Sequence, residues 1–308
     1  MEVILVGLGP IGIAVGEALV KKQIPIVGAV DLRPELAGRA LNEVVAGASP
    51  LPITSSLPSG FQPGHCAIIL TTTSKFSSVV PDLERAIAAR LHAVSTCEEM
   101  ALPDAAHAQA VHALDEKAKA AGVTLLGTGV NPGFVMDRLV LSLSGTQVQT
   151  DRVQVTRIVD AAKRRGPLRK KVGEGLSEAE WRSLASQGRI GHVGLEQSAR
   201  LVALGLGWIV DHYSESLDPV VRDGVCRGLK QIGRATVNGK ELITLELQMY
   251  AGATDPGDHI ILDGDPPIDA FLRGGVQGDR GTVGTVVRAL ERLERAPRGL
   301  VTVADVFT

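Results

Sequence analysis

Two hydrophobic patterns follow one another along this chain and change near residue 130. In the first, short apolar runs alternate with segments whose apolar residues recur at helical spacing. The apolar runs, which predict buried strands, are residues 2–6, 24–30, 66–72, 92–96 and 123–126. The helical segments are residues 10–22, 81–91 and 104–121. Strands and helices in this order form right-handed β-α-β units, so the first part is predicted to be an α/β domain with a doubly wound parallel sheet.

After about residue 130 the pattern changes to the two-residue alternation of a partly exposed sheet. Asn238-Gly239 is a strong signal for a type I′ hairpin. Apolar side chains alternate along one face directly after this turn, at Ile243, Leu245, Leu247 and Met249. The other expected elements are strands at 153–159 and 259–262 and helices at 177–187, 194–206 and 282–293. The second part is therefore predicted to be an α+β domain with a largely open mixed sheet.

A length of 308 residues also indicates two domains. We expect the first domain at 1–130 and the second at 131–279, with residues 280–308 packing back on the first. The apolar face of the second sheet needs a cover. A partner subunit is one possible cover, and it predicts a homodimer formed mainly through the second domain. The competing cover is the chain's own helices at 177–187 and 194–206.

Composition and charge narrow the class of partner. Hydrophobic residues make up 44% and charged residues 21%, which is typical of a globular chain with a sizeable core. The 32 Lys and Arg and 34 Asp and Glu leave a net charge of −2, so no global field attracts nucleic acid or an anionic membrane. The cysteines Cys66, Cys97 and Cys226 are odd in number and far apart, which supports neither a disulfide framework nor a metal site. We expect a soluble cytoplasmic protein that acts on a small molecule.

The first strand leads directly into a glycine-rich motif. Gly7-Leu8-Gly9-Pro10-Ile11-Gly12 is a G-x-G-x-x-G that follows a strand and opens a helix. In this motif Gly7 permits the tight turn, Gly9 lets the backbone approach a pyrophosphate, and Gly12 allows close packing of helix on strand. The amides and the positive end of the helix then hold the phosphates. The motif in this context predicts a Rossmann domain that binds a nicotinamide dinucleotide.

Residues after the later strands complete the predicted cofactor site. Asp31 ends the second strand, where a carboxylate accepts hydrogen bonds from the adenosine ribose and repels a 2′-phosphate. This favours NAD, whereas Arg33 offers a partner for the 2′-phosphate of NADP. Thr71, Thr72 and Thr73 supply hydroxyls at the carboxyl edge of the sheet, although a polar turn that caps the next helix explains each of them equally well.

Two further segments follow strands at this ligand-binding edge. Cys97 is followed by Glu98 and Glu99, whose carboxylates are catalytic groups, charges at a helix N-terminus or solvated side chains. Residues 127–133 combine three glycines with Asn131 and a proline, which indicates a loop in close approach to a ligand or a hinge between the domains.

At these residues the chain resembles the 2,4-diaminopentanoate dehydrogenase family, which includes the native amine dehydrogenases and is related to dihydrodipicolinate reductase. The resemblance is carried, in the family's order, by residues 95–99, 127–137, 160–175, 191–198, 274–282 and 299–305. The chain departs from the family's pattern at Gly166, Arg280 and Gly281.

The resemblance implies oxidation of an amine to a ketone with release of ammonia, and the reverse reductive amination. It places the acid/base glutamate at Glu98, with Glu99 as the second choice, and a carboxylate raised in pKa by burial suits that proton transfer. It places His192 in the substrate pocket and the basic residues from Lys163 to Lys171 near that pocket or a subunit interface. The remaining expected pocket residues are Val130, Asn131, Val135 and Met136, with Asn131 also near the cofactor.

Two alternatives stay open. A dihydrodipicolinate reductase-like enzyme would reduce a cyclic imine, but the histidine- and lysine-rich substrate motif of that branch is not recognisable in this chain. A redox sensor would bind the dinucleotide without turnover, which the presence of Glu98, Asn131 and His192 together disfavours. The particular amine does not follow from the sequence.

Overall fold

The computed structural model describes residues 1–58, 60, 64–163 and 166–307. Its backbone forms two compact units, and each is described by itself. The first unit contains residues 1–134 and 277–308, and the second contains residues 135–276.

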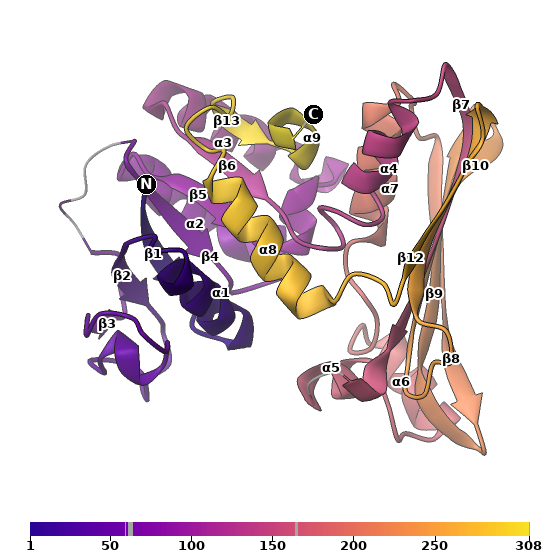
Figure 1. The fold of residues 1–308 in the computed structure, drawn as a ribbon, viewed down its shortest axis with the longest axis horizontal. Coiled ribbons are helices and arrows are strands. Elements are labelled where there is room, and N and C mark those ends of the chain that lie inside the picture. Colours follow the sequence, from indigo (N-terminus) through magenta and orange to yellow (C-terminus); the bar gives the residue numbers. More distant parts are fainter. Residues whose placement is uncertain (59, 61–63, 164–165, 308) are drawn as a thin grey trace. The chain divides into compact units, whose positions relative to one another are not determined.

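The first unit is built on a seven-stranded sheet with the order β13-β6-β5-β4-β1-β2-β3, in which every neighbouring pair is parallel (Figure 1). Its strands are β1 (Glu2–Val6), β2 (Ile26–Val30), β3 (Ile53–Thr54), β4 (Cys66–Leu70), β5 (His92–Ser95), β6 (Thr124–Gly127) and β13 (Gly299–Val301). Its α-helices are α1 (Pro10–Lys21), α2 (Phe76–Ala88), α3 (Ala108–Ala121), α8 (Gly278–Leu290) and α9 (Val303–Phe307). Helix α1 packs on α8, and α2 packs on α3. The predicted doubly wound Rossmann sheet is confirmed.

Some boundaries in this unit differ from those expected. Helix α2 begins at Phe76, five residues before Pro81, where the sequence suggested a first helical turn. The helix extends upstream because Phe76 and Val79 lie on the same face as Leu83, and all three are fully buried. Helix α8 begins at Gly278 rather than at 282, and the Gln277 side chain caps it by accepting the Arg280 amide at 2.6 Å.

The second unit contains a six-stranded mixed sheet with the order β12-β11-β7-β10-β9-β8. The pair β10–β7 is parallel and the other pairs are antiparallel. The strands are β7 (Gln149–Asp160), β8 (His212–Arg222), β9 (Val225–Val237), β10 (Lys240–Tyr250), β11 (Gly257–Asp265) and β12 (Ile268–Arg273). The helices are α4 (Arg138–Ser144), α5 (Gly166–Lys171), α6 (Glu178–Ser186) and α7 (Leu195–Gly205). The predicted open mixed sheet is confirmed, although both edge strands, β8 and β12, were missed.

The hairpin between β9 and β10 follows the sequence prediction. Val237 pairs with Lys240, and Asn238 and Gly239 have positive φ values of 52° and 74°. A type I′ turn requires positive φ at both central residues, and asparagine and glycine tolerate it best.

The chain's own helices cover the apolar face of this sheet. Ile243, Leu245 and Leu247 are at most 2% exposed, and Met249 is 8% exposed. Helix α7 packs on β9 and β10, and α6 packs on β8 and β9, so these helices lie on one side of the sheet (Figure 1). The sequence allowed either a partner subunit or the chain's own helices to cover this face, and in the structure the chain's own helices cover it.

A buried ion pair fixes the last residue of the second unit. Arg157 of β7 and Asp258 of β11 are 4% and 0% exposed, and their side chains meet at 3.0 Å. Both also bond to the backbone of Val276, the last residue of the unit, with Nη2 of Arg157 donating to its carbonyl and Oδ2 of Asp258 accepting from its amide. A buried pair is stable only when its remaining polar groups are satisfied in this way.

The described helices include none that is long and apolar enough to span a bilayer.

Candidate active site

The glycine motif has the geometry expected of a phosphate-binding loop. Gly7 has φ +89°, and a Cβ atom there would lie 2.9 Å from Cγ2 of Thr72. A Cβ atom on Gly12 would overlap the carbonyl oxygen of Gly7, so only glycine lets α1 pack this closely on the end of β1. Gly9, by contrast, faces open space, because no atom lies within 4 Å of its Cβ position. The loop therefore leaves room for a ligand at Gly9 alone.

Helix α1 presents its N-terminus at this open position. Its N-cap residue is Gly9 and its first residue is Pro10, followed by Ile11. Glycine has no side chain to accept the first helical amides, so these amides and the helix dipole are directed toward an anion at the loop.

A cavity of about 590 Å³ opens beside the loop within the first unit. Its wall includes the loop, the ends of β2 and β4, and the outer side of α2. The residues that line it include Gly7, Gly9, Asp31, Arg33, Ser55, Ser56, Leu57, Thr71, Thr72, Ser78, Asp82 and Arg85. Residues 55–57 escaped sequence reasoning because they follow the two-residue strand β3, which leaves no periodic signal.

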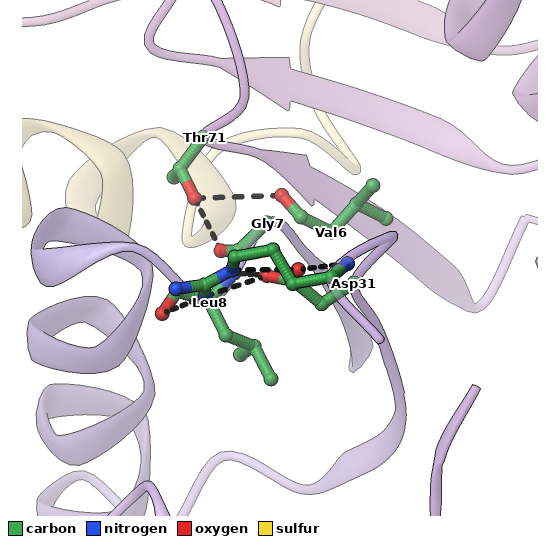
Figure 2. Close-up of polar contacts among 6 residues, drawn as sticks. Val6, Gly7, Leu8, Asp31 and Thr71 are labelled. Carbon is green, nitrogen blue, oxygen red and sulfur yellow. Dashed lines mark hydrogen bonds and ion pairs between the residues drawn. The ribbon is translucent and has the colours of Figure 1, made fainter. Parts of the chain in front are cut away.

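Asp31 binds the Leu8 amide of the glycine loop (Figure 2). The same carboxylate also binds Arg33. The Asp31 carboxylate is 7% exposed and accepts the Leu8 amide at 2.7 Å, and it also accepts both Nε and Nη2 of Arg33 at 2.9 Å. The Arg33 side chain reaches further, to the Leu8 carbonyl at 2.9 Å. The hydrogen bonds from the Arg33 side chain hold the pKa of Asp31 at about 2, so this carboxylate is charged at neutral pH.

The three threonines after β4 have different surroundings. Thr71 donates its hydroxyl to the Gly7 carbonyl at 2.6 Å and thereby holds the glycine loop (Figure 2). Thr73 accepts the Lys75 amide at 3.1 Å in the turn before α2. Thr72 is exposed and contributes to the cavity wall. Thr73 therefore belongs to a polar turn before the next helix, as one interpretation of the sequence proposed, whereas Thr71 stabilises the glycine loop through a hydrogen bond.

Glu98 and Glu99 begin the 3₁₀ helix η2 (Glu98–Ala101) after β5. Both are partly buried. The Glu99 carboxylate bonds Nζ of Lys75 at 2.8 Å and accepts the Phe76 amide at 2.8 Å, so it caps the N-terminus of α2. This is the helix-terminus role that the sequence left open for the two carboxylates.

A glycine fixes the position of η2 on the sheet. A Cβ atom on Gly127, the last residue of β6, would lie 2.5 Å from the Met100 carbonyl carbon and 2.6 Å from the Ala101 amide nitrogen. The backbone that carries Glu98 therefore rests directly on the end of β6. The sequence showed this glycine only as part of a loop.

The loop after β6 folds back on itself. Gly133 has φ +121°, and a Cβ atom there would overlap the Gly129 amide nitrogen. Val130 is 4% exposed and Asn131 is partly exposed, both in the first unit. Val135 and Met136 belong to the second unit and are 0% exposed, so neither presents surface to a ligand in this structure.

His192 lies in the second unit, two residues before the N-cap of α7, and is partly exposed. Its backbone is held by the side chain of Gln231, a residue that the sequence did not single out. In the basic segment, Arg169 forms a two-pronged ion pair with Glu174 at 2.5 and 2.8 Å, while Arg164 and Arg165 lie outside the described residues.

The parallel sheet with its glycine loop and the mixed-sheet second unit together define a two-unit Rossmann protein. Residues 134–308 match the family model of the 2,4-diaminopentanoate dehydrogenase C-terminal domain, and the chain belongs to this family. It is 27% identical to 2,4-diaminopentanoate dehydrogenase of Acetoanaerobium sticklandii, over 99% of this chain and 93% of that protein. The resemblance seen in the sequence is confirmed.

Solved structures share the fold. The amine dehydrogenase of Mycobacterium smegmatis superposes with a TM-score of 0.84 at 18% identity, covering 100% of this chain and 96% of that one. GenD2 from gentamicin A biosynthesis, solved in complex with NAD, superposes with a TM-score of 0.59 at 15% identity, covering 99% of this chain and 90% of that one.

Proposed function

We propose that this protein is an NAD(P)-dependent amine dehydrogenase that oxidises an amine or diamino acid to a ketone and ammonia and catalyses the reverse reductive amination. The observation that carries the proposal is the full-length similarity to a 2,4-diaminopentanoate dehydrogenase. The glycine loop and the adjoining cavity support it, because the loop leaves open space at a helix N-terminus, which suits a pyrophosphate, and Asp31 in the cavity wall suits a ribose.

In this proposal the residues of the first unit would hold the cofactor. The nicotinamide ring of the bound cofactor would accept the hydride that leaves the carbon bearing the amine. The open space at Gly9 and the N-terminus of α1 suit the pyrophosphate, and Asp31 suits the adenosine ribose. Thr72 and Asn131 are further cofactor candidates.

Glu98 is the proposed acid/base residue, and it would move protons at the amine nitrogen and at the water that replaces it. Oxidation of a C–N bond removes a proton together with a hydride, and hydrolysis of the resulting imine to ketone and ammonia needs further proton transfers. A carboxylate at the carboxyl edge of the sheet can mediate each of them. His192 and Val130 remain the proposed substrate residues, whereas Val135 and Met136, which the sequence placed in the pocket, are fully buried and would act only by supporting its wall.

The direct test is a screen of short-chain amines and amino acids, 2,4-diaminopentanoate among them, at alkaline pH with NAD and NADP, read as NADH absorbance. We expect turnover with at least one amine and ketone plus ammonia as products. Activity on a cyclic imine but not on ketone plus ammonia would instead indicate a reductase. NADH binding without any turnover would indicate a sensor.

Asp31 and Arg33 should set the cofactor preference, with NAD favoured. We expect Asp31→Ala to weaken NADH more than NADPH, because it removes the ribose acceptor and the group that repels a 2′-phosphate. Arg33→Ala should weaken NADPH by about tenfold, the worth of one charge-assisted hydrogen bond, and leave NADH unaffected. Fluorescence titration with both dinucleotides measures this. Arg39→Ala is a matched control, since Arg39 is an exposed arginine of the same unit that pairs with Glu43 instead. Unchanged preference in both cavity variants would refute the assignment.

A homodimer formed through the second unit is also proposed. The apolar face at Ile243 is already covered from within, so the contact would use the opposite face of the sheet, where Ile158, Ile232 and Ile261 are partly exposed. Light scattering at micromolar concentration should give twice the mass of one chain. A monomeric mass would contradict this prediction.

A further inference from the structure

A buried glutamine binds the backbone of His192 at two points. Gln231 lies on β9 and is 1% exposed. Its Oε1 accepts the His192 amide at 2.8 Å, and its Nε2 donates to the His192 carbonyl at 2.8 Å. The side-chain amide thus bonds His192 as a neighbouring strand would, although His192 lies in a loop.

Two glycines in the left-handed region shape the path of this loop. Gly191 and Gly194 flank His192 and have φ values of +135° and +118°, which only glycine adopts readily. Glycines lose more conformational entropy on ordering than other residues, so this backbone needs specific bonds to hold one conformation. The Gln231 amide provides two such bonds, and both are to His192, which lies between the two glycines.

The amide is itself oriented by a second pair of residues. Its remaining N–H donates to Oε1 of Glu215 at 2.6 Å, which distinguishes the nitrogen from the oxygen. The hydroxyl of Tyr213 donates to the other Glu215 oxygen at 2.7 Å. Burial, together with this bond, raises the pKa of Tyr213, so the phenol stays protonated as a donor. Tyr213 fits here because a Cβ atom on Gly233 would overlap its hydroxyl.

We propose that Gln231 is a positioning residue of the substrate site, which fixes the backbone of His192 and thereby the direction of its imidazole. The inference rests on the proposed function, in which His192 contacts the amine substrate. Packing alone does not require this arrangement. An apolar side chain would fill the same buried volume without three oriented hydrogen bonds, and a buried amide is tolerated only where all its bonds are made.

The first experiment compares Gln231→Glu and Gln231→Leu with the parent in steady-state oxidation of 2,4-diaminopentanoate by NAD. Gln231→Glu loses the donor to the His192 carbonyl and adds a charge beside Glu215, while Gln231→Leu loses both bonds without adding a charge. We expect KM for the amine to rise about tenfold in each, with smaller changes in kcat and in the Kd for NADH. In Gln231→Glu, KM should fall again at low pH, where the introduced carboxyl group is protonated and can donate.

Gln147→Glu is the matched control. Gln147 precedes β7, and its Nε2 donates to a backbone carbonyl, that of Pro266 at 2.7 Å, as Gln231 donates to that of His192. The same change from amide to carboxylate should leave KM at the parental value. A KM equal to the parent's in both Gln231 variants would overturn the inference. An equal loss of NADH affinity and amine affinity would also overturn it, because it would indicate a general structural role.

Two further measurements separate this inference from the proposed function. Amide hydrogen exchange at His192 should be faster in Gln231→Leu than in the parent whether or not the amine is the substrate, and unchanged exchange would overturn the two-point bond as the restraint. His192→Ala should raise KM as much as the Gln231 variants do. If His192→Ala leaves KM unchanged, the substrate role proposed for His192 is wrong; if it raises KM while the Gln231 variants do not, the positioning role is wrong.

Discussion

Replacement of Glu98 by glutamine should lower the turnover rate of amine oxidation by about 10²–10⁴-fold, the contribution of a positioned acid/base group. Glutamine keeps the size of the side chain and most of its hydrogen bonding but cannot accept a proton. The Kd for NADH should change little, because the glycine loop and Asp31, which are proposed to hold the dinucleotide, follow β1 and β2, whereas Glu98 follows β5. Stopped-flow or steady-state rates beside NADH titration of the same preparation measure both quantities.

Glu99→Gln is the control that the structure supplies. Glu99 is adjacent in sequence and also partly buried, but its carboxylate is bound to Lys75 and to the Phe76 amide. Glutamine keeps an acceptor for the amide and loses only the ion pair with a mostly exposed lysine, which is worth about 0–1 kcal/mol. We therefore expect near-parental turnover and a small decrease in melting temperature. A fast Glu98→Gln enzyme, or an inactive Glu99→Gln enzyme, would move the catalytic role away from Glu98.

Gly12→Ala should abolish measurable dinucleotide binding and lower stability at the same time. A methyl group at this position would overlap the Gly7 carbonyl oxygen and would lie 2.7 Å from Oγ1 of Thr71. These two atoms are hydrogen-bonded to each other at 2.6 Å, so neither can move without displacing the glycine loop. Overpacking of this kind costs about 1–3 kcal/mol in folded proteins. Thermal denaturation and NADH titration of the variant test the two effects.

Gly9→Ala should separate the effect on ligand binding from the effect on stability. Nothing lies within 4 Å of the Cβ position of Gly9, and its φ of −67° suits alanine. The melting temperature should therefore stay at the parental value, while NADH binding should weaken by at least about tenfold, because the methyl group would occupy the space proposed for the pyrophosphate. Full NADH affinity in Gly9→Ala would show that the phosphates bind elsewhere.

The sequence by itself determined the features that depend on local chemistry. Parallel strands buried on both faces are continuous apolar runs, and the glycine motif needs specific backbone angles over six residues, so both are visible in the one-dimensional pattern. The same holds for Asn238-Gly239, whose two residues are sufficient to specify the hairpin. The family resemblance added the proposed chemistry, which no pattern of periodicity contained.

Edge strands and helix starts were beyond local reasoning. Strands β8 and β12 lie at the two edges of the second sheet and are largely exposed, which removes the strong apolar run of a buried strand. Helix α2 begins where the carboxylate of Glu99, 23 residues away in sequence, accepts the Phe76 amide. A cap supplied from so far along the chain leaves no signal near the helix itself.

Tertiary structure alone decided how the candidate site residues are used. Glu98 and Glu99 are alike in sequence, and only the approach of α2 commits Glu99 to a helix terminus. Thr71 supports the glycine loop through the Gly7 carbonyl, 64 residues away. Gly127 receives the 3₁₀ helix η2, 27 residues away, and Gln231 binds the His192 backbone, 39 residues away. The physical reason is the same in each case. A hydrogen bond or a close approach acts over a few ångströms in space, whereas the hydrophobic period records only which face of an element is buried.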